Sequence, residues 1–82
     1  EKPPDLIVCD IIMPGMKGPE LVKRLKTGKW SDSKVLYISG YTADSFIKSG
    51  VLEGGEKMLQ KPFNPETFSR KVREVLDDEK VD

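Results

Sequence analysis

The sequence predicts an α/β fold in which short parallel strands alternate with helices in the order βαβαβα. Three short apolar runs, at residues 6–9, 35–38 and 58–60, are each bounded by turn-forming or charged residues. Continuous apolar runs of this length are typical of strands that are buried on both faces of a parallel sheet. Amphipathic stretches follow the runs, and this alternation favours a parallel sheet with right-handed crossovers.

The first and last helices have clear start and stop signals. Gly18 and Pro19 open the first, because proline is compatible with the first helical turn, and Gly28 ends it. The last helix is predicted to begin after Asn64, a favourable N-cap, with Pro65 at its first position. The acidic residues 77–79 oppose the helix dipole and are expected to fray. The apolar stripe of this helix has helical spacing and comprises Phe68, Val72, Val75 and Leu76.

The middle helix has weaker signals. Thr42 is a candidate N-cap, and Ala43, Phe46 and Ile47 are candidates to face the core. The three glycines that follow limit this helix to about two turns, which is shorter than the average helix. We therefore expect the segment to be the most mobile of the predicted elements.

The bulk composition excludes several classes of function. The chain has 82 residues and a formal net charge of zero, so neither nucleic acid nor an anionic membrane surface is expected as a partner. No apolar run approaches the roughly 18–20 residues of a membrane span, and the amino terminus has no signal-peptide pattern. Cys9 is the single cysteine, which fits a reducing compartment and predicts a cytoplasmic location. Because the chain has no histidine, Ser-His-Asp and Cys-His nucleophile sites are excluded.

Three chemically active side chains follow the three predicted strands: Asp10, Ser39 and Lys61. Since ligands bind beyond the carboxyl ends of the strands in open parallel sheets, these three are the candidate site residues. A carboxylate can act as a nucleophile toward phosphorus. An ammonium group and a hydroxyl can neutralise and hydrogen-bond the phosphoryl oxygens, which carry the developing charge. The pattern therefore indicates phosphoryl transfer to Asp10.

Three motifs connect this pattern to a family. The stretch DLIVCDIIMPGMKG at residues 5–18 resembles the phosphoacceptor strand and loop of response-regulator receiver domains of two-component systems. SGYT at 39–42 resembles their switch hydroxyl position, and QKPF at 60–63 resembles their lysine-proline element and is similar to receivers of hybrid sensor histidine kinases. The resemblance implies a three-layer, flavodoxin-like receiver fold. Residues 1–79 would supply its third strand to its last helix, as a partial receiver domain, and 80–82 a frayed tail.

The resemblance also implies a phosphoacceptor switch rather than a free-standing enzyme, whether or not the parent protein is a hybrid kinase. Asp10 would accept a phosphoryl group from a phosphohistidine of a histidine kinase or histidine phosphotransfer domain, and Ser39 and Lys61 would contact the phosphate. That partner must be separate, because this chain has no histidine. Mg²⁺ would bind Asp10 and the backbone carbonyl of Ile12. The peptide bond before Pro62 is expected to be cis.

Two departures from the family pattern affect these expectations. The acidic pair that completes the magnesium site lies on the family's first strand, which these residues do not include, so we expect an incomplete metal site in this segment. Met58 stands where receivers usually carry an aromatic switch residue, and its thioether fills such a gap without offering a hydroxyl. The strand at 6–9 would lie at an open edge, from which we expect dimerisation or strand exchange.

Two alternative functions fit parts of the pattern. The first is an interaction domain that keeps the receiver fold without being phosphorylated. The second is a phosphohydrolase or mutase that forms an aspartyl phosphate, but such enzymes require a second aspartate two positions after the nucleophile, where this chain has Ile12. A P-loop nucleotide enzyme is excluded because the sequence has no Gly-Lys-Ser/Thr loop.

Overall fold

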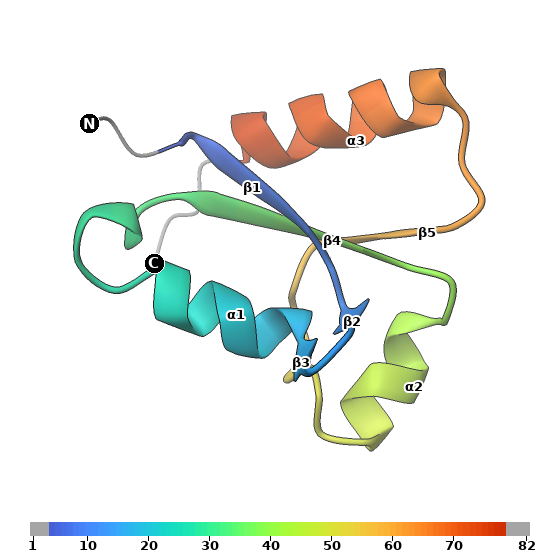
Figure 1. Cartoon of the computed structure of the whole chain (residues 1–82). Coiled ribbons are helices and arrows are strands. Elements are labelled where there is room, and N and C mark those ends of the chain that lie inside the picture. The colour runs from blue at the N-terminus through green and yellow to red at the C-terminus, as the bar shows by residue number, and fades with distance from the viewer. Residues whose placement is uncertain (1–3, 79–82) are drawn as a thin grey trace.

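The computed structural model describes residues 4–78 and contains a three-stranded parallel sheet with helices on both faces (Figure 1). The elements follow the predicted βαβαβα order, with a small hairpin and a 3₁₀ turn added. In chain order they are β1 (Leu6–Asp10), β2 (Ile12–Met13), β3 (Met16–Lys17), α1 (Gly18–Leu25), the 3₁₀ turn η1 (Gly28–Trp30), β4 (Lys34–Ser39), α2 (Ala43–Lys48), β5 (Met58–Gln60) and α3 (Pro65–Asp77).

The strand order in the sheet is β1-β4-β5, so the second predicted strand is the central one. β1 pairs with β4 in parallel, from Leu6 opposite Lys34 to Asp10 opposite Ile38. β4 pairs with β5 in parallel, and Ser39 lies opposite Gln60. Within the described range β1 therefore occupies an edge of the sheet, as the sequence predicted.

The helices form two layers that cover opposite faces of the sheet (Figure 1). Val22 of α1 and Phe46 of α2 pack on one face, in a core cluster that also contains Ile7, Cys9, Ile11, Tyr37 and Leu52. On the other face, α3 packs on β4, where Leu36 is fully buried and Val75 is nearly so. The predicted three-layer arrangement is confirmed.

β1 departs from the prediction that both of its faces are buried. Ile7 and Cys9 are buried, but Val8 between them is 42% exposed. Val8 pairs with Leu36 of β4 and so shares its face of the sheet, yet Leu36 has no exposed surface. The prediction was wrong at Val8 because α3 packs on β4 and leaves this face of the edge strand open.

α2 is a short helix held to the core mainly by one side chain. The Thr42 side chain caps it by accepting a hydrogen bond from the Ser45 N–H at 3.3 Å, as the sequence predicted. Phe46 is buried, and its carbonyl accepts hydrogen bonds from the amides of Val51 and Leu52. Ile47 was predicted to face inward but is 42% exposed. A helix of six residues that turns Phe46 into the core directs its neighbour about 100° away.

The carboxyl end of α3 is held by two lysines from other elements. Lys34 Nζ donates hydrogen bonds to the carbonyls of Leu76 and Asp78, at 2.6 and 2.9 Å. Lys57 Nζ lies 3.2 Å from Asp78 Oδ2. These cations satisfy and neutralise the negative end of the helix, which ends at Asp77 with Asp78 as its C-cap. The fraying expected of the acidic residues 77–79 stays a prediction. The predicted tail at 80–82 lies outside the described residues.

Between residues 4 and 78, no helix has both the length and the apolar character that crossing a bilayer requires.

Candidate functional site

The three candidate residues stand at the same edge of the sheet. Asp10 is the last residue of β1, Ser39 is the last residue of β4, and Lys61 directly follows β5. Because the three strands are parallel, their carboxyl ends lie side by side. This is the edge at which open α/β sheets bind ligands.

Asp10 and Lys61 form an ion pair at this edge. Lys61 Nζ lies 3.4 Å from Asp10 Oδ1, and the two side chains are 39% and 47% exposed for Asp10 and Lys61 respectively. A pair with this exposure contributes little to stability, about 0–1 kcal/mol. Both groups remain open to solvent, so an incoming anionic group can reach the carboxylate and the ammonium together.

Ser39 is almost fully buried and is connected to its neighbours by two hydrogen bonds. Its Oγ accepts from the Tyr41 N–H at 3.0 Å, and its backbone carbonyl accepts from the Lys61 N–H at 2.7 Å. The second bond fixes the backbone of Lys61 next to that of Ser39. Within the described part of the chain, the Ser39 side chain forms no hydrogen bond with the Asp10 carboxylate or the Lys61 ammonium.

The loop after Asp10 folds back as a hairpin, which the sequence did not predict. β2 and β3 pair antiparallel around Pro14 and Gly15, and Gly15 has a φ of +80° that favours glycine in the turn. Ile12, the candidate carbonyl ligand, opens this hairpin, and its side chain is exposed. Two two-residue strands are too short for a pattern of alternating side chains to reveal them.

Gly18 has a role that the sequence did not reveal. Its amide donates to the Ile11 carbonyl at 2.6 Å, and a Cβ added to it would lie 2.0 Å from the carbonyl oxygen of Asp10. Its φ lies outside the left-handed region, so the glycine is required by space rather than by the turn. Only a residue without a side chain lets the start of α1 approach Asp10 so closely.

The segment after Lys61 is fixed by a turn and an aromatic contact. The Lys61–Pro62 peptide bond is cis. Phe63 stacks on Phe68 of α3, with ring centroids 5.7 Å apart and planes 18° apart. Asn64 caps α3 by accepting from the Thr67 N–H at 2.8 Å. These contacts hold both ends of the short connection between β5 and α3.

Met58, the candidate switch residue, lies in β5 opposite Tyr37 of β4. Its side chain is half-buried and packs against the core cluster on the face covered by α1 and α2. A flexible thioether fills this space by packing alone, since it has no hydrogen to donate.

The residues present supply only part of a magnesium site. Mg²⁺ prefers octahedral oxygen ligands, and Asp10 offers one carboxylate with the nearby loop carbonyls as further donors. Within residues 4–78, no three acidic, cysteine or histidine side chains are arranged to hold a metal ion. These residues therefore do not form a complete site by themselves.

The fold and the site define a parallel α/β domain with a carboxylate and an ammonium paired at its ligand-binding edge. The chain belongs to the response regulator receiver domain family, whose family model matches residues 1–73.

The chain is similar in sequence to two known proteins and in fold to a third. The chain is 33% identical to the sensor kinase CckA of Brucella abortus (strain 2308) over 73 residues, which are 89% of this chain and 8% of CckA. It is 32% identical to the transcriptional regulatory protein SpaR of Bacillus subtilis, over 95% of this chain and 34% of SpaR. Its fold is similar to the solved structure of the Vibrio cholerae chemotaxis protein CheY4, with a TM-score of 0.72 and 32% identity over 87% of this chain and 60% of that one. The chain thus spans less than two thirds of the length of each of these proteins.

Proposed function

We propose that this segment is the phosphoacceptor part of a receiver in a two-component phosphorelay, and that Asp10 accepts the phosphoryl group. The observation that carries the proposal is the pairing of the Asp10 carboxylate with the Lys61 ammonium, 3.4 Å apart, at the carboxyl edge of the sheet. Membership of the receiver family supports it. So does the accessibility of both groups, because a phosphodonor must reach the carboxylate.

The chemistry is the transfer of a phosphoryl group from nitrogen to oxygen. An oxygen of the Asp10 carboxylate would form the new O–P bond while the P–N bond of a phosphohistidine breaks. The electron pair of that bond returns to the imidazole nitrogen, which takes up a proton. The product at Asp10 is an acyl phosphate. Lys61 would neutralise charge on the equatorial phosphoryl oxygens, where it accumulates in the transition state.

Mg²⁺ would further neutralise the phosphoryl oxygens when it is bound. The residues described here that would contribute to holding it are Asp10, through its carboxylate, and Ile12, through its backbone carbonyl. Further carboxylate ligands would come from outside residues 4–78, because no three acidic, cysteine or histidine side chains in that range are arranged to hold a metal ion.

Ser39 and the loop that follows it would transmit the state of Asp10. The Ser39 Oγ accepts from the Tyr41 N–H, so its own proton is available for a phosphoryl oxygen. Movement of Ser39 toward that oxygen would release the Tyr41 amide, which lies directly before the cap of α2. The proposed partner is a histidine kinase or histidine phosphotransfer domain, and the single cysteine supports a cytoplasmic location.

The test is the mass of the full-length protein after incubation with acetyl phosphate and Mg²⁺. We expect an adduct of one phosphoryl group that hydroxylamine removes, as an acyl phosphate requires. Asp10→Asn should abolish it. Asp5→Asn is the matched control, because Asp5 precedes β1 at the opposite end of the same strand and is exposed; it should leave the adduct unchanged.

The absence of an adduct on the unmodified protein, in the presence of a kinase or phosphotransfer donor as well, would overturn the proposal. The alternative, an interaction domain that is not phosphorylated, would then stand. An adduct that persists in Asp10→Asn would assign the phosphoryl group to another residue.

A further inference from the structure

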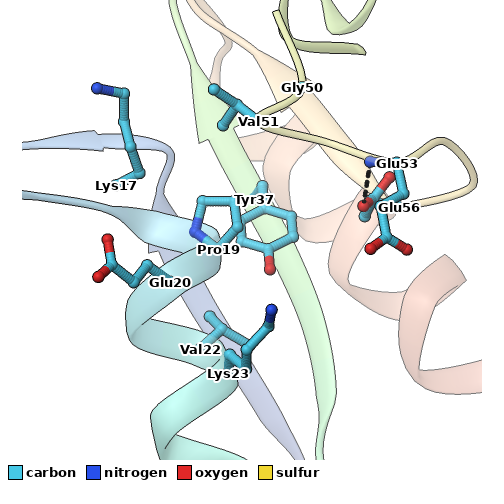
Figure 2. A pocket seen from close by; sticks show the side chains of 10 residues that line it. All are labelled: Lys17, Pro19, Glu20, Val22, Lys23, Tyr37, Gly50, Val51, Glu53 and Glu56. Atoms are coloured by element: carbon cyan, nitrogen blue, oxygen red, sulfur yellow. Dashed lines mark hydrogen bonds between the residues drawn. The ribbon is translucent and has the colours of Figure 1, made fainter.

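A pocket of about 560 Å³ lies away from the candidate site, between α1 and the connection from α2 to β5 (Figure 2). This volume falls in the usual range for small-molecule sites, roughly 300–1,000 Å³. Its apolar surface comes from Pro19 and Val22 on the α1 wall and from Val51 on the opposite wall. Tyr37 of β4 lies between the two walls and forms the floor. No residue of the Asp10–Lys61 pair lines it.

The Tyr37 hydroxyl is a polar group at the floor of this pocket. The residue is only 6% exposed, and Figure 2 shows its hydroxyl pointing to the side of Lys23. No side chain within residues 4–78 forms a hydrogen bond with this hydroxyl, and solvent reaches it through the pocket. Burial, followed by the nearby Cys9 and Glu56, raises the pKa of Tyr37 to about 12, so the phenol stays neutral at physiological pH. The hydroxyl faces the open pocket, so it can exchange water for a polar atom of a ligand.

The two walls of the pocket carry opposite charges. Lys17 and Lys23 stand on the α1 side, and neither forms an ion pair with a described residue. Glu20 on the same side lies 3.8 Å from Arg24, which offsets its charge. Glu53 and Glu56 stand on the opposite wall (Figure 2).

Glu56 is fixed in its charged form by its own loop. Burial alone would raise its pKa, but backbone hydrogen bonds from Glu53, Glu56 and Gly54 outweigh that effect and lower it. The Glu53 and Gly54 amides donate to its two carboxylate oxygens at 2.9 and 2.7 Å. The negative wall is therefore preorganised, and the Glu53 carboxylate remains available beside it.

We propose that this pocket binds an elongated small molecule with an apolar middle, a carboxylate toward Lys23, and an ammonium group toward Glu53. The middle of the ligand would pack on Val22 and Val51, and a polar atom would pair with the Tyr37 hydroxyl. A ligand with a single charge would form an ion pair with only one of the two walls.

The test uses ligand-observed saturation-transfer NMR with the full-length protein and three probes of similar size: 4-(aminomethyl)benzoate, benzoate and benzylamine. We expect 4-(aminomethyl)benzoate to bind at least about five-fold more tightly than either singly charged probe, since each charge-assisted contact adds affinity. Tyr37→Phe should weaken its binding by about three- to ten-fold, the usual effect of one hydrogen bond.

The charge variants provide the sharper distinction. Lys23→Gln should reduce the advantage of 4-(aminomethyl)benzoate over benzylamine, and Glu53→Gln should reduce its advantage over benzoate. Lys48→Gln, on α2 and outside the pocket lining, should change nothing. Thermal unfolding of each variant verifies that it is folded. The proposal fails if 4-(aminomethyl)benzoate gives no signal at about 10 mM, if the three probes bind equally, or if Tyr37→Phe and Lys23→Gln both bind it like the unmodified protein.

Discussion

Asp10 and Lys61 come from opposite edges of the three-stranded sheet, and their side chains meet across the end of the central strand. Asp10 closes β1, Lys61 follows β5, and β4 lies between these strands. Ser39, the last residue of β4, is fixed to Lys61 by the 2.7 Å hydrogen bond between their backbones. The site therefore spans the full width of the described sheet.

Replacing Lys61 should lower the rate of phosphorylation while leaving the free energy of unfolding nearly unchanged. Because its ion pair with Asp10 is partly exposed, Lys61→Gln should change the free energy of unfolding by about 1 kcal/mol or less. Under the proposed function, the rate of phosphorylation by acetyl phosphate should fall at least about ten-fold, since a charge that stabilises the transition state is lost. Urea unfolding and intact-mass kinetics measure the two effects. Lys48→Gln is the control for loss of a lysine, and equal rates in the two variants would contradict the assignment.

Gly18→Ala should be among the most disruptive single-atom changes near the site. The added Cβ would lie 2.0 Å from the backbone oxygen of Asp10, so the backbone itself must shift. We expect a loss of about 2 kcal/mol or more in the free energy of unfolding. Gly40→Ala is the matched control, because no atom lies within 4 Å of its added Cβ and its φ is not positive. Similar urea midpoints for the two variants would show that α1 does not need this close approach.

The sequence predicted the order of the elements and the edge at which the site lies. Those predictions rested on signals that act locally: apolar runs for the strands, and caps such as Asn64 and Thr42, which the structure confirms. Asp10 and Lys61 could be placed together because parallel strands bring their carboxyl ends to one edge.

Other features could not be predicted because they depend on which element covers which. Val8 lies in an apolar run that predicts a buried strand. Its exposure follows only from the placement of α3 on β4. Ile47 has the same apolar character as Phe46, and the helix can direct only one of them into the core. The need for Gly18 arises from a contact with the backbone of Asp10, which no residue pattern records.

The end of α3 should depend strongly on Lys34. Its ammonium donates to two helix carbonyls, those of Leu76 and Asp78, and Lys34→Met should cost about 1–3 kcal/mol in the free energy of unfolding. Lys57→Met removes only a partly exposed ion pair with Asp78 and should cost about 1 kcal/mol or less. Chemical denaturation ranks the two variants. A larger effect of Lys57→Met would mean that the ion pair, rather than the carbonyl contacts, holds the helix end.

Tyr37 should make the fold sensitive to alkaline pH. Mainly through burial, its pKa in the folded state is about 12, against about 10 when unfolded. A raised pKa means that the stabilisation is complete below pH 10 and is lost as the pH rises toward 12. The loss is at most about 2–3 kcal/mol, because solvent in the pocket screens the charge that forms on the hydroxyl. Urea unfolding between pH 9 and 12 should therefore show a steeper decline for the unmodified protein than for Tyr37→Phe, and parallel declines would contradict it.

The open edge of β1 predicts self-association when the 82-residue segment is produced by itself. Val8 is 42% exposed beside the unpaired backbone of this edge, which invites pairing with a second copy. Val8→Lys should shift the segment toward the monomer, because a charge at an edge opposes such pairing. Sedimentation velocity measures the oligomeric state. A folded, monomeric segment without the substitution would refute this prediction.

The central position of β4 has a consequence for how the protein folds. Neither β1 nor β5 has another partner in the described sheet, so no hydrogen-bonded pair of these strands exists until β4 is in place. Asp10 and Lys61 can therefore meet only after β4 has paired with both neighbours, and we expect the three strands to fold cooperatively. The amides of β4 are accordingly expected to exchange with solvent most slowly, and only through opening of the whole domain.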